Sequence, residues 1–263
     1  MGRYLKLLWI QVRASTTVAM QYRLDFLVQG VVSAFWSLLA LVPLGIIFSG
    51  PRQSVAGWSF AETLVVLGWF TLLKAVLEGA INPSLIAVVE HIRKGTLDFV
   101  LLKPADAQFL VSTSKFEPWR VLDLFVGFGL LGYAFARLGR VPHASHVATA
   151  GVMLAIAVLL LYSLWILVIS AAFYVVRVDN LSFLFTSIFD AARWPASIFT
   201  GAWRVIFTFV IPLAVMTTYP AMALLGTLEL GTAAVAAACA LGFAVAARAV
   251  WKVSLARYTS ASS

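Results

Sequence analysis

The stretch "ATAGVMLAIAVLLLYSLWILVISAAFYVV" (Ala148 to Val176) contains no charged residue over its whole length. A helix of about 20 apolar residues crosses the hydrocarbon core of a bilayer, so this run is long enough for one membrane span. The rest of the chain has the same character, since 62% of its 263 residues are hydrophobic and 11% are charged. Soluble domains have roughly 25% charged residues. The sequence therefore predicts an all-α protein with several membrane spans.

Further apolar runs predict spans near residues 26 to 48, 60 to 81, 121 to 139 and 230 to 250. The region from 178 to 226 is also apolar, but charged, proline and glycine residues interrupt it. We expect another span at about 178 to 198, followed by a re-entrant pair of short helices at 201 to 226; a span at 205 to 225 is the alternative. Because irregular backbone at membrane depth must be buried in protein or line a cavity, the re-entrant segment would face other subunits or a pathway.

The distribution of lysine and arginine predicts the orientation, because these residues concentrate in cytoplasmic loops. Thirteen of them fall on one predicted side: Arg3, Lys6, Arg13, Arg23, Arg93, Lys94, Lys103, Lys115, Arg120, Arg177, Arg248, Lys252 and Arg257. The other side has Arg52, Arg137 and Arg140, and the sides of Arg193 and Arg204 are not assigned. Both termini are therefore predicted to be cytoplasmic, which requires an even number of spans and favours six.

The first 23 residues have the pattern of an amphipathic helix rather than of a span. Cations recur on one helical face (Arg3, Lys6 and Arg13), and large apolar side chains occupy another (Leu5, Leu8, Trp9 and Val12). Such a helix lies in the membrane interface. An additional contact with a partner subunit is a second possible role for it.

The longest polar segment, residues 82 to 120, contains its own helix signals. Asn82 is a suitable N-cap with Pro83 at the first helical position, and Gly95 is placed to end this helix. Arg93 and Lys94 fall in the last turn, where the helix dipole favours cations. This segment is therefore predicted to be a cytoplasmic helical region.

The ten residues "GTLDFVLLKP" (Gly95 to Pro104) predict a second, very short helix in this region. The Thr96 hydroxyl can cap it, Asp98 lies in its first turn, and Pro104 prevents its continuation. A helix this short is not stable alone and cannot cross a bilayer. Its leucine, valine and phenylalanine side chains need a surface, which is either the lipid interface with the protein's own helices or a cytoplasmic protein.

These residues resemble a known motif: Glu90, "GTLD" at 95 to 98, "LL" at 101 to 102 and Pro104 are similar to the cytoplasmic signature of the second-type ATP-binding-cassette (ABC) exporter permeases. In that family the stretch forms a coupling helix that contacts the ATPase subunit. The resemblance implies the following contact residues: Glu90, Arg93, Lys94, Gly95, Thr96, Leu97, Asp98, Leu101, Leu102 and Pro104.

Two other segments are similar to the same family: the proline-broken stretch from Trp194 to Ala221 and the ending "ARYTSASS" (Ala256 to Ser263). The ending resembles that of short six-span permeases of the bacterial inner membrane, which work with a second permease and a separate ATPase. The resemblance implies one permease domain over residues 1 to 263 that works as a dimer; it favours a heterodimer with a related permease, and a homodimer is the alternative. It also implies export as the direction of transport.

No G-x-x-x-x-G-K-[ST] motif occurs, so ATP and Mg²⁺ are expected on the partner subunit and no cofactor in this chain. The sequence gives no sign of catalysis by the chain itself. Nucleic acid is not expected as a partner, because the cations of a membrane protein first indicate cytoplasmic loops beside anionic lipid. His143 and His146 lack a nearby third ligand, so no metal site is predicted.

Charged residues inside the predicted spans form a second candidate site. Lys74 and Glu78 lie one helical turn apart, with Glu62 on roughly the same side, and Asp190 and Arg193 are three positions apart. A charge at mid-membrane costs about 2.5 to 3.5 kcal/mol, so we expect these residues to face the interior and to pair. They serve either packing or the substrate pathway.

Two alternative functions, a secondary transporter and a membrane enzyme, remain open. A proton-coupled transporter could use the carboxylates and Lys74 as a relay, although such folds show paired broken helices and only one broken region is present. An enzyme would need a convergent polar site, for which three scattered histidines give little support. Gly127, Gly129, Gly132 and the small residues from 231 to 247 allow close helix packing, within the chain or in a dimer.

Overall fold

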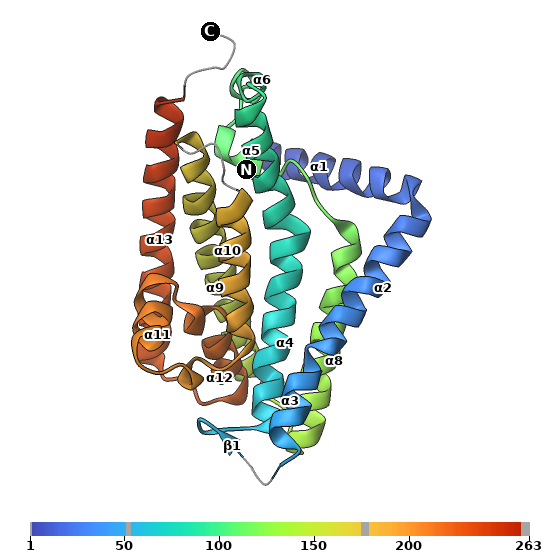
Figure 1. The fold of residues 1–263 in the computed structure, drawn as a ribbon, viewed down its shortest axis with the longest axis vertical. Helices are drawn as coiled ribbons and strands as arrows, with labels where there is room; N and C mark the ends of the chain where they lie inside the picture. The colour runs from blue at the N-terminus through green and yellow to red at the C-terminus, as the bar shows by residue number, and fades with distance from the viewer. Residues whose placement is uncertain (1, 51–53, 175–178, 259–263) are drawn as a thin grey trace.

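The computed structural model describes residues 2–50, 54–174 and 179–258. Five helical segments in these residues are long and apolar enough to cross a membrane: Arg23–Phe48, Phe60–Arg93, Pro118–Leu138, Ala144–Phe173 and Leu230–Ala256. The described strands are β1 (Ser54–Val55) and β2 (Trp58–Ser59), which pair antiparallel. The architecture is the all-α one that the composition predicts (Figure 1).

Helix α4 (Phe60–Val76) is the centre of the bundle. It continues without a break through the π-helix η1 (Leu77–Ile81) into α5 (Asn82–Arg93). In its most apolar window 72% of the residues are buried, against 11% for the span that contains α2 (Arg23–Leu39) and α3 (Leu41–Phe48). Figure 1 shows α4 between α2 and α8 on one side and α9, α10 and α13 on the other. The second span is therefore the interior one, and the first is mostly exposed.

The helix was expected to end near residue 81 and restart at Asn82, and this expectation is wrong. Pro83 cannot donate to the carbonyl of Gly79 four positions earlier, which normally breaks a helix. Here the Glu117 N–H donates to that carbonyl at 2.8 Å, and the π-helix absorbs the local change in spacing. Asn82 is not a cap, since its Oδ1 accepts a hydrogen bond from Trp165 Nε1 at 3.1 Å.

Helix α8 (Val121–Leu138) packs closely along α4. A Cβ atom added at Gly127 would lie 2.7 Å from the side chain of Leu72 on α4, so the close approach depends on the missing side chain. A Cβ at Gly129 or Gly132 would have no neighbour within 4 Å. Of the three glycines of this span, Gly127 therefore serves packing within the chain.

Helices α9 (Ala144–Ser170) and α13 (Leu230–Ala256) form a second close pair. Three alanines from the small-residue run of α13 are buried: Ala236, Ala240 and Ala247. The small-residue run of the last span thus packs, at these positions, within the chain. Short 3-10 helices connect the longer elements: η2 (Pro118–Arg120), η3 (Ala171–Phe173), η4 (Asp190–Arg193) and η5 (Ala196–Ile198).

Helix α1 (Gly2–Gln21) lies across one end of the bundle and turns into α2 at Tyr22 (Figure 1). None of its residues is buried, and Leu5 and Trp9 are among its exposed apolar side chains. Its first turn is fixed by the loop after α6 (Asp98–Leu101), whose Pro104 carbonyl accepts a hydrogen bond from Arg3. The start of α1, the end of α13 and α5 to α7 (Ala107–Ser112) therefore share one end of the molecule.

The region from 178 to 198 does not form a span of the expected length in the part that the structure describes. Helix α10 (Asp179–Phe189) has 11 residues, about 16 Å, against about 30 Å of hydrocarbon core. After η4 the helix ends, because Trp194 precedes Pro195 and is forced into an extended conformation (φ −103°, ψ 146°). Arg177, counted above as cytoplasmic, lies outside the described residues.

Residues 201 to 226 form two short helical pieces, as expected. The first piece contains α11 (Ala202–Val205) and the π-helix η6 (Ile206–Val210), and the second contains the π-helix η7 (Ala214–Thr218) and α12 (Tyr219–Leu225). The helix is interrupted around Pro212, so the alternative of one continuous span at 205 to 225 is wrong. Figure 1 places both pieces near the start of α13, away from α5 and α6.

Candidate coupling region and membrane charge network

The end of α5 has the geometry that its sequence predicts. Gly95 adopts φ +66°, a left-handed conformation that glycine reaches at no steric cost. The Thr96 N–H donates to the His91 carbonyl at 2.9 Å, and the Gly95 N–H donates to the Ile92 carbonyl at 3.3 Å. These two bonds form a Schellman motif, which satisfies the last carbonyls of α5 and reverses the chain.

Thr96 does not cap the short helix that follows. Its hydroxyl lies 2.7 Å from His91 Nδ1, so the side chain points back to α5. Helix α6 begins after Leu97, which is itself helical and makes no side-chain cap. Thr96 directly follows the reversing glycine, and its N–H takes part in the Schellman motif. Its side chain is therefore directed toward α5 and not toward the start of α6.

The large apolar residues that form and flank α6, from Leu97 to Leu102, include a buried one and several exposed ones. Leu97 is fully buried and packs into the chain's own core. Phe99, Leu101 and Leu102 are 68%, 38% and 81% exposed. Leu97 is therefore a packing residue and is removed from the predicted contact set. Phe99, which the motif did not include, joins Leu101 and Leu102 in what we call the α6 apolar face.

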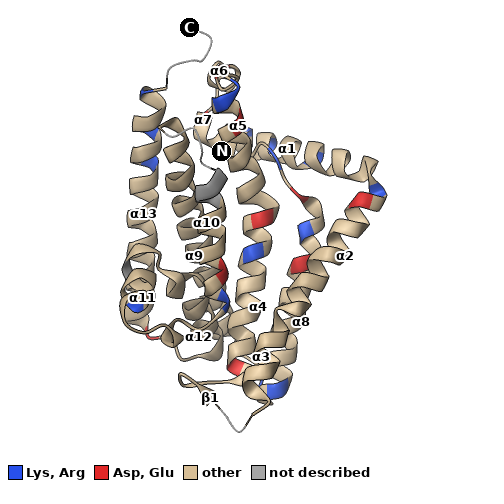
Figure 2. Ribbon diagram, in the orientation of Figure 1, with Lys and Arg blue, Asp and Glu red and all other residues tan. Residues whose placement is uncertain are grey.

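The other predicted contact residues lie around this face, at the same end of the molecule (Figure 2). Lys94 Nζ and Glu90 Oε2 form an exposed ion pair at 3.1 Å. Arg93 is the last residue of α5 and Asp98 the first of α6, on either side of the reversing turn. The region thus surrounds an apolar surface with charged residues.

A further contact that the sequence did not reveal ties α7 to the last span. Asp106 caps α7 by accepting a hydrogen bond from the Phe109 N–H at 3.0 Å. The Arg248 guanidinium on α13 donates to both carboxylate oxygens of Asp106, at 3.2 and 2.5 Å, and this pairing lowers the pKa of Asp106 below its usual value. Arg248 also donates to Gln108 Oε1 at 2.6 Å. The loop after α6 is therefore anchored to α13.

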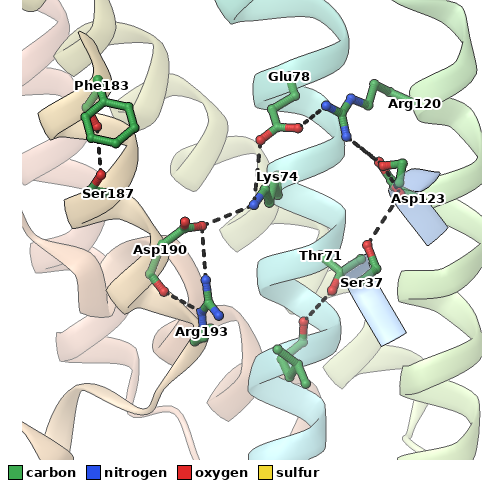
Figure 3. A network of polar contacts seen from close by, with 12 residues as sticks. Ser37, Thr71, Lys74, Glu78, Arg120, Asp123, Phe183, Ser187, Asp190 and Arg193 are labelled. Carbon is green, nitrogen blue, oxygen red and sulfur yellow. Dashed lines mark hydrogen bonds and ion pairs between the residues drawn. The ribbon is translucent and has the colours of Figure 1, made fainter. Parts of the chain in front are cut away.

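Several charged residues in the interior of the bundle form one connected network (Figure 3). Lys74 pairs with Glu78 at 3.6 Å and with Asp190 at 3.2 Å, and Asp190 pairs with Arg193 at 3.3 Å. The two local pairs predicted from the sequence are confirmed. The Lys74 to Asp190 link joins α4 to η4, which the sequence alone did not connect.

Two further residues extend this network, and sequence reasoning missed both. Arg120 pairs with Glu78 and, at 3.2 Å, with Asp123. The Asp123 side chain is 5% exposed and accepts hydrogen bonds from the Ser33 hydroxyl at 2.8 and 2.7 Å. Arg120 had been counted as a loop cation, although its spacing of three residues from Asp123 is a helical pairing signal.

Glu62 does not belong to the network. Its Oε2 accepts hydrogen bonds from the Ser59 N–H at 3.0 Å and the Ser59 hydroxyl at 2.9 Å. Together with the bond from the Glu62 N–H to Ser59 Oγ, these contacts form a capping box at the start of α4. The expectation that Glu62 joins the other charges is wrong, and its role is to begin the helix.

The network lines a cavity of about 520 Å³. All six charged residues of the network contribute to its wall: Lys74, Glu78, Arg120, Asp123, Asp190 and Arg193. Three aromatic rings also line it: Trp36, Phe70 and Trp119. The cavity therefore combines apolar surface with paired charges in a bundle whose helices are long enough to cross the membrane, and such an arrangement is typical of the pathways of membrane transport proteins.

Comparison with protein families gives a more specific assignment. Residues 34–262 match the family model described as ABC-2 family transporter protein, and the chain belongs to that family. The resemblance drawn from the motif around Gly95 is thereby confirmed: the protein is a multi-pass membrane permease of the ABC-2 type, and the family implies partnership with an ATPase subunit. Neither the curated proteins nor the solved structures contain a match to the chain, and no finding favours the proton-coupled alternative.

Proposed function

We propose that this protein is the permease subunit of an ATP-driven exporter and that it forms half of the translocation pathway. A separate ATPase dimer would bind ATP and Mg²⁺ and dock on the α6 apolar face. ATP-driven movement of the ATPase would then shift the permease between inward-facing and outward-facing states, which requires that the ATPase contact the two states differently. The observation that carries the proposal is the exposure of this face on an otherwise well-packed turn.

Energetics supports a partner at this face. Complete burial of an exposed Phe or Leu side chain is worth roughly 1.5 to 3 kcal/mol, and most of this is not gained at Phe99 and Leu102, which are 68% and 81% exposed. These side chains are exposed on an ordered turn, because the buried Leu97 and the Schellman motif at Gly95 hold α6 in place. A rigid, exposed apolar face with a charged rim is typical of a protein interface.

The remaining elements fit the same arrangement. The proposal places α5 to α7 and both termini in the cytoplasm, α1 in the membrane interface, and α11 to α12 as a re-entrant segment. It keeps six spans by including α10 and η4 as the fifth, shortened one. It also keeps the bacterial inner membrane as the location and a related permease as the second membrane subunit.

The test is co-purification with the ATPase subunit. The double variant Phe99→Asp plus Leu102→Asp, expressed with the neighbouring ATPase gene, should insert normally and lose the ATPase by roughly tenfold or more, since both side chains are expected at the centre of the interface. Val141→Asp is a matched control, because Val141 is 86% exposed and belongs to the connection between α8 and α9, which lies at the end of the bundle away from α6. Retention of the ATPase by the double variant would show that docking occurs elsewhere.

A further inference from the structure

The cavity beside α4 has two chemically different walls. One is the charge network, and the other is formed by α2 and α3. Val32, Trp36 and Leu39 belong to the second wall and are 44%, 62% and 41% exposed. Helix α2 is part of a segment long and apolar enough to cross the membrane. The apolar rim of the cavity therefore lies at a depth where lipid chains, rather than water, reach it.

The charges of the other wall alternate in sign along the network. In order of contact they are Arg193, Asp190, Lys74, Glu78, Arg120 and Asp123. Three cations and three carboxylates sum to zero, and each group is neutralised by its neighbours. A lone anion or cation that entered would add one net charge to this balanced site, which costs about 2.5 to 3.5 kcal/mol at mid-membrane. A ligand that carries both signs avoids this cost.

Two links of the network, Lys74 to Asp190 and Asp190 to Arg193, are more accessible than the others. The side chains of Lys74 and Asp190 are 31% and 33% exposed, against 16% for Glu78 and 5% for Asp123. Their contact at 3.2 Å joins two different elements, α4 and η4. Separation of this pair therefore needs a movement between elements and no disruption of a helix. A ligand with two opposite charges fits between these two groups.

We propose that the cavity binds an amphiphile with a zwitterionic headgroup. Its anionic group pairs with Lys74, its cationic group pairs with Asp190, and its apolar chain leaves along the rim at Trp36 and Leu39. The volume of about 520 Å³ is within the roughly 300 to 1,000 Å³ of small-molecule sites and accommodates the headgroup with the first part of one chain. This inference rests on the proposed function, because it names the class of molecule that the exporter would take from the membrane.

The experiment measures binding to the purified permease alone, in neutral detergent. The probe is lysophosphatidylcholine with a fluorescent acyl tail, compared with the same tail on an anionic sulfate head and on a cationic trimethylammonium head. The zwitterionic probe should bind roughly tenfold or more tightly than either, and Lys74→Met or Asp190→Asn should each weaken it by roughly tenfold or more. Free phosphocholine should compete only weakly, because it lacks the chain.

One control tests whether a loss of binding is due to misfolding, and a second tests whether the ligand binds in the cavity. The conservative pair Lys74→Arg plus Asp190→Glu keeps the sign of the charge at both positions, and it should retain the preference for the zwitterion even if the single variants are unstable. Arg137→Met should leave the affinity unchanged, since Arg137 stacks on Tyr133 outside the cavity.

Equal binding of the three probes, or a preference for a singly charged head, would overturn the inference. Competition by free phosphocholine as strong as that by the amphiphile would overturn the amphiphile assignment, because the ligand would then be a water-soluble zwitterion. The assay contains no ATPase, so failed docking at the α6 apolar face cannot alter its result. A failed binding assay likewise leaves the docking test intact.

Discussion

The turn between α5 and α6 and the charge network in the membrane are held together over very different distances along the chain. Gly95 and Thr96 bond to carbonyls three and five residues away. Lys74 and Asp190 are 116 positions apart. The hydrogen bonds of the turn therefore depend on its own local sequence, whereas the network exists only when the bundle is assembled. Variants of the network should disturb the whole protein, and variants of the turn should act locally.

The largest effect is expected from Arg120→Met in the network. Arg120 pairs with both Glu78 and Asp123, and its loss leaves Glu78 with Lys74 alone and removes the ion pair of the buried Asp123. Breaking such a buried pair from one side costs about 3 to 5 kcal/mol of unfolding free energy. Thermal unfolding in detergent micelles should show this, with partial recovery when Asp123→Asn is added. An unchanged midpoint would mean that the network contributes little to the fold.

A smaller effect is expected from Gly127→Ala, at the α4 to α8 contact that supports the network. The added Cβ would meet the Leu72 side chain at 2.7 Å and its backbone nitrogen at 3.2 Å, and overpacking of this kind costs about 1 to 3 kcal/mol. Gly129→Ala on the same helix is the matched control, since its Cβ meets nothing within 4 Å and alanine favours the helix. Equal unfolding midpoints for the two variants would contradict the close approach.

Gly95→Ala tests the turn. Its φ of +66° costs an alanine about 1 to 2 kcal/mol, and the loss falls on the α5 to α6 reversal rather than on the spans. Amide hydrogen exchange should become faster around residues 95 to 102 and stay unchanged in α9. Gly242→Ala, in an open position of α13, is a suitable control. Faster exchange throughout the bundle would show that the turn is not a local unit.

The smallest effect is expected at Asp106, where the turn region meets the bundle. Its pKa lies below the usual value of an aspartate because it pairs with Arg248, so the pair stabilises the fold above about pH 4. This contribution is lost as the pH falls through the lowered pKa. With side chains 36% and 41% exposed, the pair is worth less than about 1 kcal/mol. The difference in unfolding midpoint between the protein and Asp106→Asn should therefore vanish in acid; a constant difference would indicate loss of the α7 cap alone.

Features with nearby partners could be read from the sequence. The Gly95 terminus and the Lys74 to Glu78 pair depend on contacts within five residues, and the structure has both. The predictions from the sequence were wrong where a residue far away in the chain changed the local structure. Glu117 supplies the hydrogen bond that Pro83 cannot make, so α4 continues where the sequence predicts a stop. Leu97 is buried rather than exposed because the core accepts it.

The sequence by itself determined the membrane class, four of the long apolar helices close to their observed bounds, and the family motif at residues 90 to 104. The membrane class and the long helices depend on the composition of the chain and on the length of its apolar runs. The motif is a local pattern of residues, so it too is visible in the sequence. Only the tertiary structure decided which charges meet, which α6 side chains face outward, and that a cavity lies beside α4. These depend on contacts between distant segments, and no local pattern in the chain specifies which segments become neighbours.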